Sequence, residues 1–86
     1  MGLIRVLLAD SHVIFREGLK SVLAREPDVR IVGEAGDGGE AVHLTRQQRP
    51  HVVIMDVQLP GLSGVQVSRA IRSVDPRIEI VVLATR

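Results

Sequence analysis

The stretch "IMDVQLPGLSG", residues 54–64, places an aspartate at the end of an apolar run, with a proline–glycine turn close behind it. With the two valines before it, the run predicts a buried strand over residues 52–55 that ends at Asp56. A carboxylate in that position costs solvation free energy unless a partner stabilises it. A partner for Asp56 is therefore expected from elsewhere in the chain.

Further apolar runs alternate with stretches of helical spacing. Ser11 and Asp37 are expected to cap the first two helices, since their side chains accept hydrogen bonds from unpaired backbone N–H groups. Alternating strands and helices indicate an α/β fold with a parallel sheet and right-handed crossovers. The patterns predict strands over 3–9, 29–32, 52–55 and 78–84, and helices from 13 to before Pro27, over about 38–49 and over about 65–74.

The composition limits the classes of function. The 86 residues suit one small domain, and 45% hydrophobic content is enough for a core. The net charge of +1 without charge blocks, together with one Phe and no Trp or Tyr, argues against nucleic-acid binding by this segment. Cysteine is absent, which excludes disulfides and thiolate metal sites. No signal peptide or membrane span is evident, so we expect a cytoplasmic protein without membrane contact.

Two of the predicted strands end in aspartate, at Asp10 and Asp56. In a parallel sheet, ligands bind beyond the carboxyl ends of the strands, so neighbouring strands would bring both carboxylates together. Two such charges repel unless a cation lies between them, and oxygen-only ligands favour Mg²⁺. Asp56 would then be a nucleophile for a phosphoryl group, and Gln58 could present its backbone carbonyl to the metal.

Four motifs resemble the receiver domain of two-component response regulators, in the subgroup whose receivers precede a helix-turn-helix output domain: "LLAD" at 7–10, "FREGL" at 15–19, "VGEAGDGGEA" at 32–41 and "MDVQLPGLSG" at 55–64. The resemblance implies a flavodoxin-like three-layer sandwich. Residues 1–86 would form an incomplete receiver with strand order 2-1-3-4. It would lack the fifth strand and the last two helices, and the output domain would be absent.

The resemblance also implies a function. Asp56 would accept a phosphoryl group from a phosphohistidine of a sensor histidine kinase, with Mg²⁺ as cofactor, and switch a downstream transcriptional output. Asp10 matches the first residue of the family's acidic pair, and Gln58 matches the position that ligates metal through its carbonyl. Such a domain takes part in its own phosphorylation and dephosphorylation and is otherwise no enzyme.

The chain departs from the family pattern at three places. Ser11 stands at the second acidic position, where it would line the rim of the site. Ala84 falls at the position of the switch Ser/Thr, with Thr85 one residue later. No residue corresponds to the lysine that follows strand 5 in the family. Ser11 and Ala84 motivate an alternative, a degenerate receiver that acts as an interaction module without phosphorylation.

Three other expectations come from the residues. An aspartyl-phosphate phosphatase is disfavoured, because Gln58 stands where a general acid would be needed. His12, His43 and His51 are scattered and read as surface residues, although His12 could line the rim of the site beside Asp10. The fourth strand would leave an unpaired edge, which predicts a homodimer or an oligomer with exchanged elements.

Overall fold

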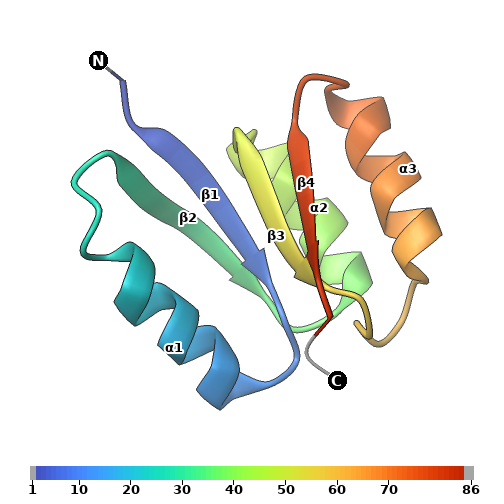
Figure 1. Cartoon of the computed structure of the whole chain (residues 1–86). Coiled ribbons are helices and arrows are strands. Elements are labelled where there is room, and N and C mark those ends of the chain that lie inside the picture. The colour runs from blue at the N-terminus through green and yellow to red at the C-terminus, as the bar shows by residue number, and fades with distance from the viewer. Residues whose placement is uncertain (1, 85–86) are drawn as a thin grey trace.

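The structure, a computed structural model, describes residues 2–84. The strands are all parallel and pair in the order β2-β1-β3-β4, which confirms the α/β fold and the strand order expected from the sequence (Figure 1). The elements are β1 (Ile4–Ala9), α1 (Val13–Leu23), β2 (Val29–Ala35), α2 (Gly38–Gln48), β3 (Val52–Asp56), α3 (Gly64–Val74) and β4 (Glu79–Leu83).

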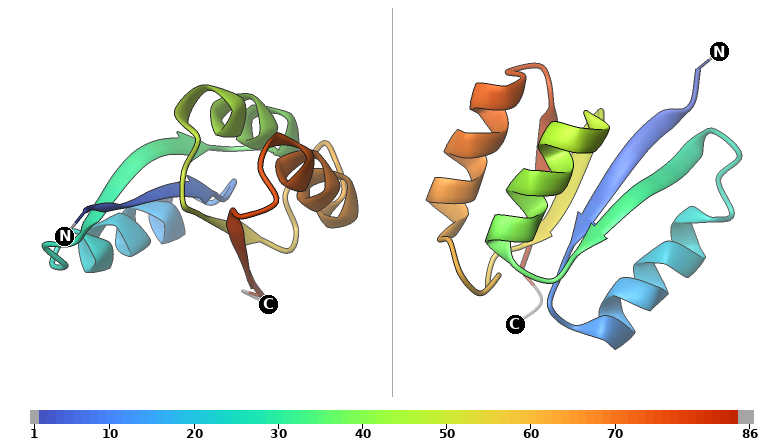
Figure 2. Two further views of the ribbon diagram at one scale, coloured as in Figure 1. Left: turned by 90° about the horizontal axis from the view of Figure 1, so that it is seen from above. Right: turned by 180° about the vertical axis from the view of Figure 1, so that it is seen from behind.

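The sheet lies between two layers of helices, with α1 on one face and α2 and α3 on the other (Figure 2). Alternate residues of a strand point to opposite faces. Leu7 and Val53 therefore pack with Val67 and Ile71 in the main core, beneath α2 and α3. All four are fully buried, so this face supplies most of the hydrophobic stabilisation.

The central and the edge strands differ in burial. Val6–Ala9 of β1 are at most 3% exposed, whereas Leu3 and Ile4 are 45% and 44% exposed, so the strand is buried on both faces only in its second part. At the edge, Val81 and Val82 of β4 are 43% and 50% exposed. The apolar sequence of β4 is thus only partly covered by the described residues.

Strand β2 is longer than the sequence predicted. It continues through Gly33 to Ala35, whereas the prediction ended it at Val32 because glycine usually interrupts a strand. Gly33 pairs with Leu7 just after a register shift in β1. A Cβ atom at residue 33 would lie 2.8 Å from Cδ1 of Leu7. The glycine therefore allows the Leu7 side chain to pack closely against the backbone of β2.

The helix starts follow the sequence in part. Asp37 caps α2 as predicted, because its Oδ1 accepts a 2.8 Å hydrogen bond from the backbone N–H of Glu40. Ser11 does not cap α1, and that prediction is wrong. His12 occupies the N-cap position, in an extended conformation and without a side-chain capping bond. Within residues 2–84, no helix is both long and apolar enough to cross a membrane.

Candidate functional site

Asp10 and Asp56 lie side by side at the carboxyl edge of the sheet. Strands β1 and β3 are hydrogen-bonded neighbours, and Ala9 pairs with Met55 across them. The residues that follow this pair are the two aspartates, and each is only 2% exposed. The convergence expected from the strand ends is therefore confirmed, and it places two buried carboxylates in one site.

His12 lies against both carboxylates. Its Nδ1 atom is 3.1 Å from Oδ1 of Asp10 and 3.5 Å from Oδ2 of Asp56. Its backbone N–H also donates a 2.7 Å hydrogen bond to Oδ1 of Asp10. The side chain of His12 is 40% exposed, so His12 is a surface residue in part, and it lies at the rim beside Asp10 as the alternative expected. His43 and His51 are exposed, as expected.

The three side chains have the chemistry of a metal-binding group. One ligand atom from each of Asp10, His12 and Asp56 lies within 4.8 Å of the other two. Carboxylate oxygens suit Mg²⁺, and an imidazole nitrogen adds a donor that many divalent ions accept. The donor set therefore fits a divalent cation.

The loop after β3 orients Asp56. The backbone N–H of Gln58 donates a 3.0 Å hydrogen bond to Oδ1 of Asp56. Further along, Gly61 has a φ of 87°, a left-handed conformation that favours glycine. The carbonyl of Pro60 accepts a 3.0 Å bond from the N–H of Gly38, which ties the loop to the start of α2. The tight turn read from the sequence thus holds the carboxylate in place.

Arg16 of α1 binds the backbone of Asp10, the residue that carries the other carboxylate. Its Nη1 donates a 2.6 Å hydrogen bond to the backbone carbonyl of Asp10, and its Nε donates to Oε1 of Glu34 at 3.1 Å. Lys20 also pairs with Glu34, at 3.0 Å. Hydrogen bonds to Glu17, and next to Glu34, raise the pKa of the Lys20 ammonium. The sequence reasoning missed Arg16, although it lies within the quoted motif "FREGL".

The remaining predicted positions lie at the periphery. Ser11 is exposed and lies between Asp10 and His12 in the chain. Asp56 pairs with Leu83 at the end of β4, so the exposed Ala84 follows directly beside the site. Thr85 lies outside the described residues. The switch role of position 84 or 85 stays a prediction.

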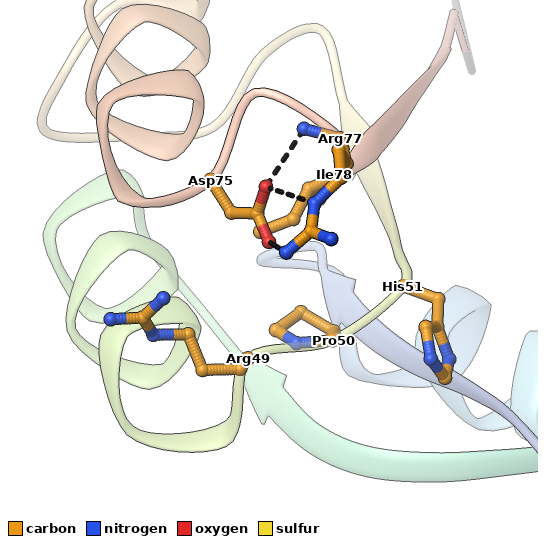
Figure 3. A pocket seen from close by; sticks show the side chains of 6 residues that line it. All are labelled: Arg49, Pro50, His51, Asp75, Arg77 and Ile78. Atoms are coloured by element: carbon orange, nitrogen blue, oxygen red, sulfur yellow. Dashed lines mark hydrogen bonds and ion pairs between the residues drawn. The ribbon is translucent and has the colours of Figure 1, made fainter.

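A separate pocket opens at the amino ends of β3 and β4, the opposite edge of the sheet (Figure 3). In it, the Arg77 guanidinium forms an ion pair of 3.0 Å with Asp75. The hydrogen bonds and charge of Arg77 hold the pKa of the Asp75 carboxyl below its usual value. This pocket holds neither Asp10 nor Asp56. Its lining consists of Arg49, Pro50, His51, Asp75, Arg77 and Ile78.

Comparison with known proteins identifies relatives over almost the whole chain. The family model of the response regulator receiver domain matches residues 6–86. The transcriptional regulatory protein YxjL of Bacillus subtilis is 43% identical over 82 residues, which are 95% of this chain and 38% of the relative. The transcriptional regulatory protein DegU of Brevibacillus brevis is 36% identical over 81 residues, 94% of this chain and 34% of that protein.

A solved structure shows the same fold. The signal receiver domain of the response regulator NarL from Mycobacterium tuberculosis superimposes with a TM-score of 0.92 at 34% identity. The match covers 100% of this chain and 69% of that one. Against the curated relatives, the chain spans only about a third of the full length, 38% and 34% for the two regulators above.

Proposed function

The chain belongs to the family of response regulator receiver domains, and on that premise we propose that Asp56 is the phosphoacceptor of a two-component signalling pathway. The donor is a phosphohistidine on a sensor histidine kinase. The observation that carries the proposal is the pairing of Asp10 and Asp56, two carboxylates buried side by side at the carboxyl edge of the sheet. Burial of two like charges is costly and is sustained where it serves a site.

The transfer step follows from the position of Asp56. A carboxylate oxygen of Asp56 attacks the phosphorus, and a P–O bond forms as the P–N bond to the histidine breaks. The leaving imidazole keeps the bonding electron pair and takes up a proton. The hydrogen bond from the Gln58 N–H orients the Asp56 carboxylate, so less rotational freedom is lost at the reaction.

Mg²⁺ is the proposed cofactor, held by the carboxylates of Asp10 and Asp56 and by the backbone carbonyl of Gln58. When bound, it offsets negative charge on the transferring phosphoryl oxygens. The fit rests on two buried oxygen donors within reach of one ion. Ser11, at the rim, adds only a hydroxyl, a weaker ligand for Mg²⁺ than a carboxylate.

We place this domain within a longer regulator of the cytoplasm. The chain spans 38% of YxjL and 34% of DegU, and both of these relatives are transcriptional regulatory proteins, which supports this proposal. The output is therefore proposed to be transcriptional, with DNA contacted by another part of the protein. Phosphorylation would act on the switch position, for which the sequence offers Ala84 or Thr85. The comparisons do not favour the contact-only alternative.

We propose in addition that the 86-residue chain associates through β4. Strand β4 is an edge of the described sheet, and Val81 and Val82 are about half exposed. Beside it, Met55, Val65 and Val82 line an apolar groove between β4 and α3. Edge pairing or exchange of an element would cover both surfaces. Sedimentation should show a dimer or higher oligomer, and a monomer at high concentration would contradict this.

The intact mass of the chain after incubation with a small phosphodonor tests the main proposal. We expect a Mg²⁺-dependent gain of one phosphoryl group, which the variant Asp56→Asn loses. The variant Asp37→Asn is the matched control, because Asn preserves the cap of α2 at an aspartate outside the site. The absence of any gain, or a gain that Asp56→Asn retains, would overturn the proposal.

A further inference from the structure

Hydrogen bonds hold both of the peptide groups that flank the Cα atom of Asp10. The backbone N–H of Asp10 donates a 2.9 Å bond to the carbonyl of Ala35, and the Asp10 carbonyl accepts a 2.6 Å bond from Nη1 of Arg16. Asp10 follows Ala9, the last residue of β1, so strand pairing no longer fixes its carbonyl. Because φ and ψ are the two soft dihedral angles of a residue, these two bonds set the direction in which the Asp10 side chain leaves the backbone.

Arg16 is itself held in place by its neighbours. Its Nε donates a 3.1 Å bond to Oε1 of Glu34, and only 18% of its side chain is exposed. Lys20 pairs with the other carboxylate oxygen of Glu34, at 3.0 Å. Nη1 of Arg16 also lies 3.4 Å from the carbonyl of Ala35, so one guanidinium reaches the ends of both β1 and β2. A group ordered in advance reduces the entropy that is lost when a ligand binds nearby.

A purely structural role for Arg16 is the simplest alternative. Helix α1, all of which the structure describes, contains no buried residue, and Arg16 connects this helix to the strand ends. Loss of the bond to Asp10 would destabilise the chain in either role, because a carbonyl would lose its partner. The affinity of the site for a cation separates the two roles, since only a positioning role changes it in the folded chain.

We infer that Arg16 is a positioning residue for the phosphoacceptor site and that it acts through the backbone carbonyl of Asp10. The inference rests on the proposed function, in which Asp10 is a ligand of Mg²⁺. Arg16 does not hold the metal. It fixes the backbone from which one of the two carboxylates reaches the metal. Groups that orient metal ligands are typically worth about 10–100-fold in metal affinity or activity.

The charge and the position of Arg16 predict opposite effects on Mg²⁺ binding. A guanidinium repels a cation, so by charge alone the loss of Arg16 should strengthen the binding of Mg²⁺. Loss of the hydrogen bond to Asp10 should weaken it, because the carboxylate is then less well directed. A weaker affinity in a variant without the positive charge therefore reports the position of Arg16 and not its charge.

Isothermal titration of the 86-residue chain with Mg²⁺ measures this effect in wild type, Arg16→Gln and Lys20→Gln. We expect Arg16→Gln to weaken Mg²⁺ binding by about tenfold. Lys20→Gln is the matched control, because it removes the same charge from α1 and a partner of the same Glu34, whereas Lys20 forms its ion pairs with Glu17 and Glu34 only among the described residues. Its affinity should stay within about twofold of wild type, since salt screens a partly exposed charge. Circular dichroism at the titration temperature checks that each variant is folded.

Arg16→Lys decides the question if Arg16→Gln does not fold. Lysine keeps the charge but lacks the fork that serves Asp10 and Glu34 together, so weaker Mg²⁺ binding is again expected. NMR on wild type needs no variant. The Nε–H resonance of Arg16 should shift when Mg²⁺ is added, because the guanidinium is bonded to the backbone of a metal ligand.

Four results would overturn the inference: an Mg²⁺ affinity at or above that of wild type in the Arg16 variants, an equal loss in Lys20→Gln, an unshifted Arg16 resonance, or a wild type that does not bind Mg²⁺. The last result would also contradict the proposed cofactor. In the first three cases, Mg²⁺-dependent phosphorylation of Asp56 would leave the proposed function standing. Weaker Mg²⁺ binding in the Arg16 variants of a chain that is never phosphorylated would support the inference and contradict the proposed function alone.

Discussion

The guanidinium of Arg16 donates a 2.6 Å hydrogen bond from Nη1 to the backbone carbonyl of Asp10. A residue of α1 thereby fixes the end of β1, where the first carboxylate of the site emerges. The same side chain bonds to Glu34 of β2, and only 18% of it is exposed. Arg16 therefore joins two strands and a helix at the edge of the sheet that carries the site.

Replacement of Arg16 by Lys should destabilise the chain. Lysine keeps the positive charge but lacks the forked donors that serve two acceptors at once. We expect a loss of about 1–3 kcal/mol in the free energy of unfolding, because acceptors that are largely shielded from water lose a partner. Urea denaturation measures it. Arg69→Lys, at an exposed position of α3, should stay within about 0.5 kcal/mol, and an equal effect of both variants would contradict the role of Arg16.

Two adjacent glycines of α2 should respond differently to alanine. A Cβ at residue 38 would lie 2.8 Å from Cγ2 of Val67 and 3.1 Å from the backbone oxygen of Leu62. Gly38→Ala should therefore cost about 1–3 kcal/mol through overpacking. A Cβ at residue 39 meets only Oδ1 of Asp37, at 3.5 Å. Gly39→Ala should be neutral or stabilising by up to about 1 kcal/mol. Thermal unfolding of both variants decides, and a destabilising Gly39→Ala would contradict the account.

Much of this fold could be predicted from apolar spacing, because strands and helices differ in period and the chain alternates between them. Strand β2 was predicted too short at Val32. In the sequence, Gly33 indicates the end of a strand. The structure shows instead that Gly33 pairs with Leu7, and that a Cβ atom at residue 33 would collide with the Leu7 side chain.

The site was predictable where it depends on strand ends and hidden where it depends on side-chain direction. Parallel pairing of β1 with β3 is enough to bring Asp10 and Asp56 together. The orientation of His12 depends on its extended backbone at the N-cap position and on its hydrogen bond to Asp10. Neither feature produces a periodic pattern in the sequence. Arg16 reaches Asp10 across space in the same way.

The pH dependence of stability should reveal the ion pair between Asp75 and Arg77. In the folded chain, Arg77 holds the pKa of the Asp75 carboxyl below its usual value. In the unfolded chain, the pKa of an aspartate carboxyl is about 3.9. The pair therefore stabilises the fold above that pH, and the contribution is lost as the pH falls through the lowered folded pKa. The difference in urea midpoint between wild type and Asp75→Asn should be constant above about pH 5 and shrink in acid.

Asp28→Asn is the control for this measurement, at an exposed aspartate that forms no ion pair with the described residues. Its difference from wild type should not shrink in the same way. A difference for Asp75→Asn that grows as the pH falls would contradict the assignment.

Restoration of the second acidic residue should strengthen the binding of Mg²⁺. Ser11→Asp adds a carboxylate at the rim of the site, and a further charge near the ion should raise Mg²⁺ affinity by roughly tenfold. Isothermal titration with Mg²⁺ measures the gain. Ser21→Asp, at an exposed position of α1, carries the same change in net charge and should have no such effect. Equal gains in both variants would point to a general charge effect and contradict a specific ligand position.

The central claim is that Asp56 carries the phosphoryl group, and chemical trapping tests it most directly. Borohydride reduces an aspartyl phosphate to homoserine, so tandem mass spectrometry of the phosphodonor-treated chain can locate the modified residue. The account predicts homoserine at residue 56, only after phosphodonor treatment in the presence of a divalent metal. Homoserine at another aspartate, or at none, would contradict it.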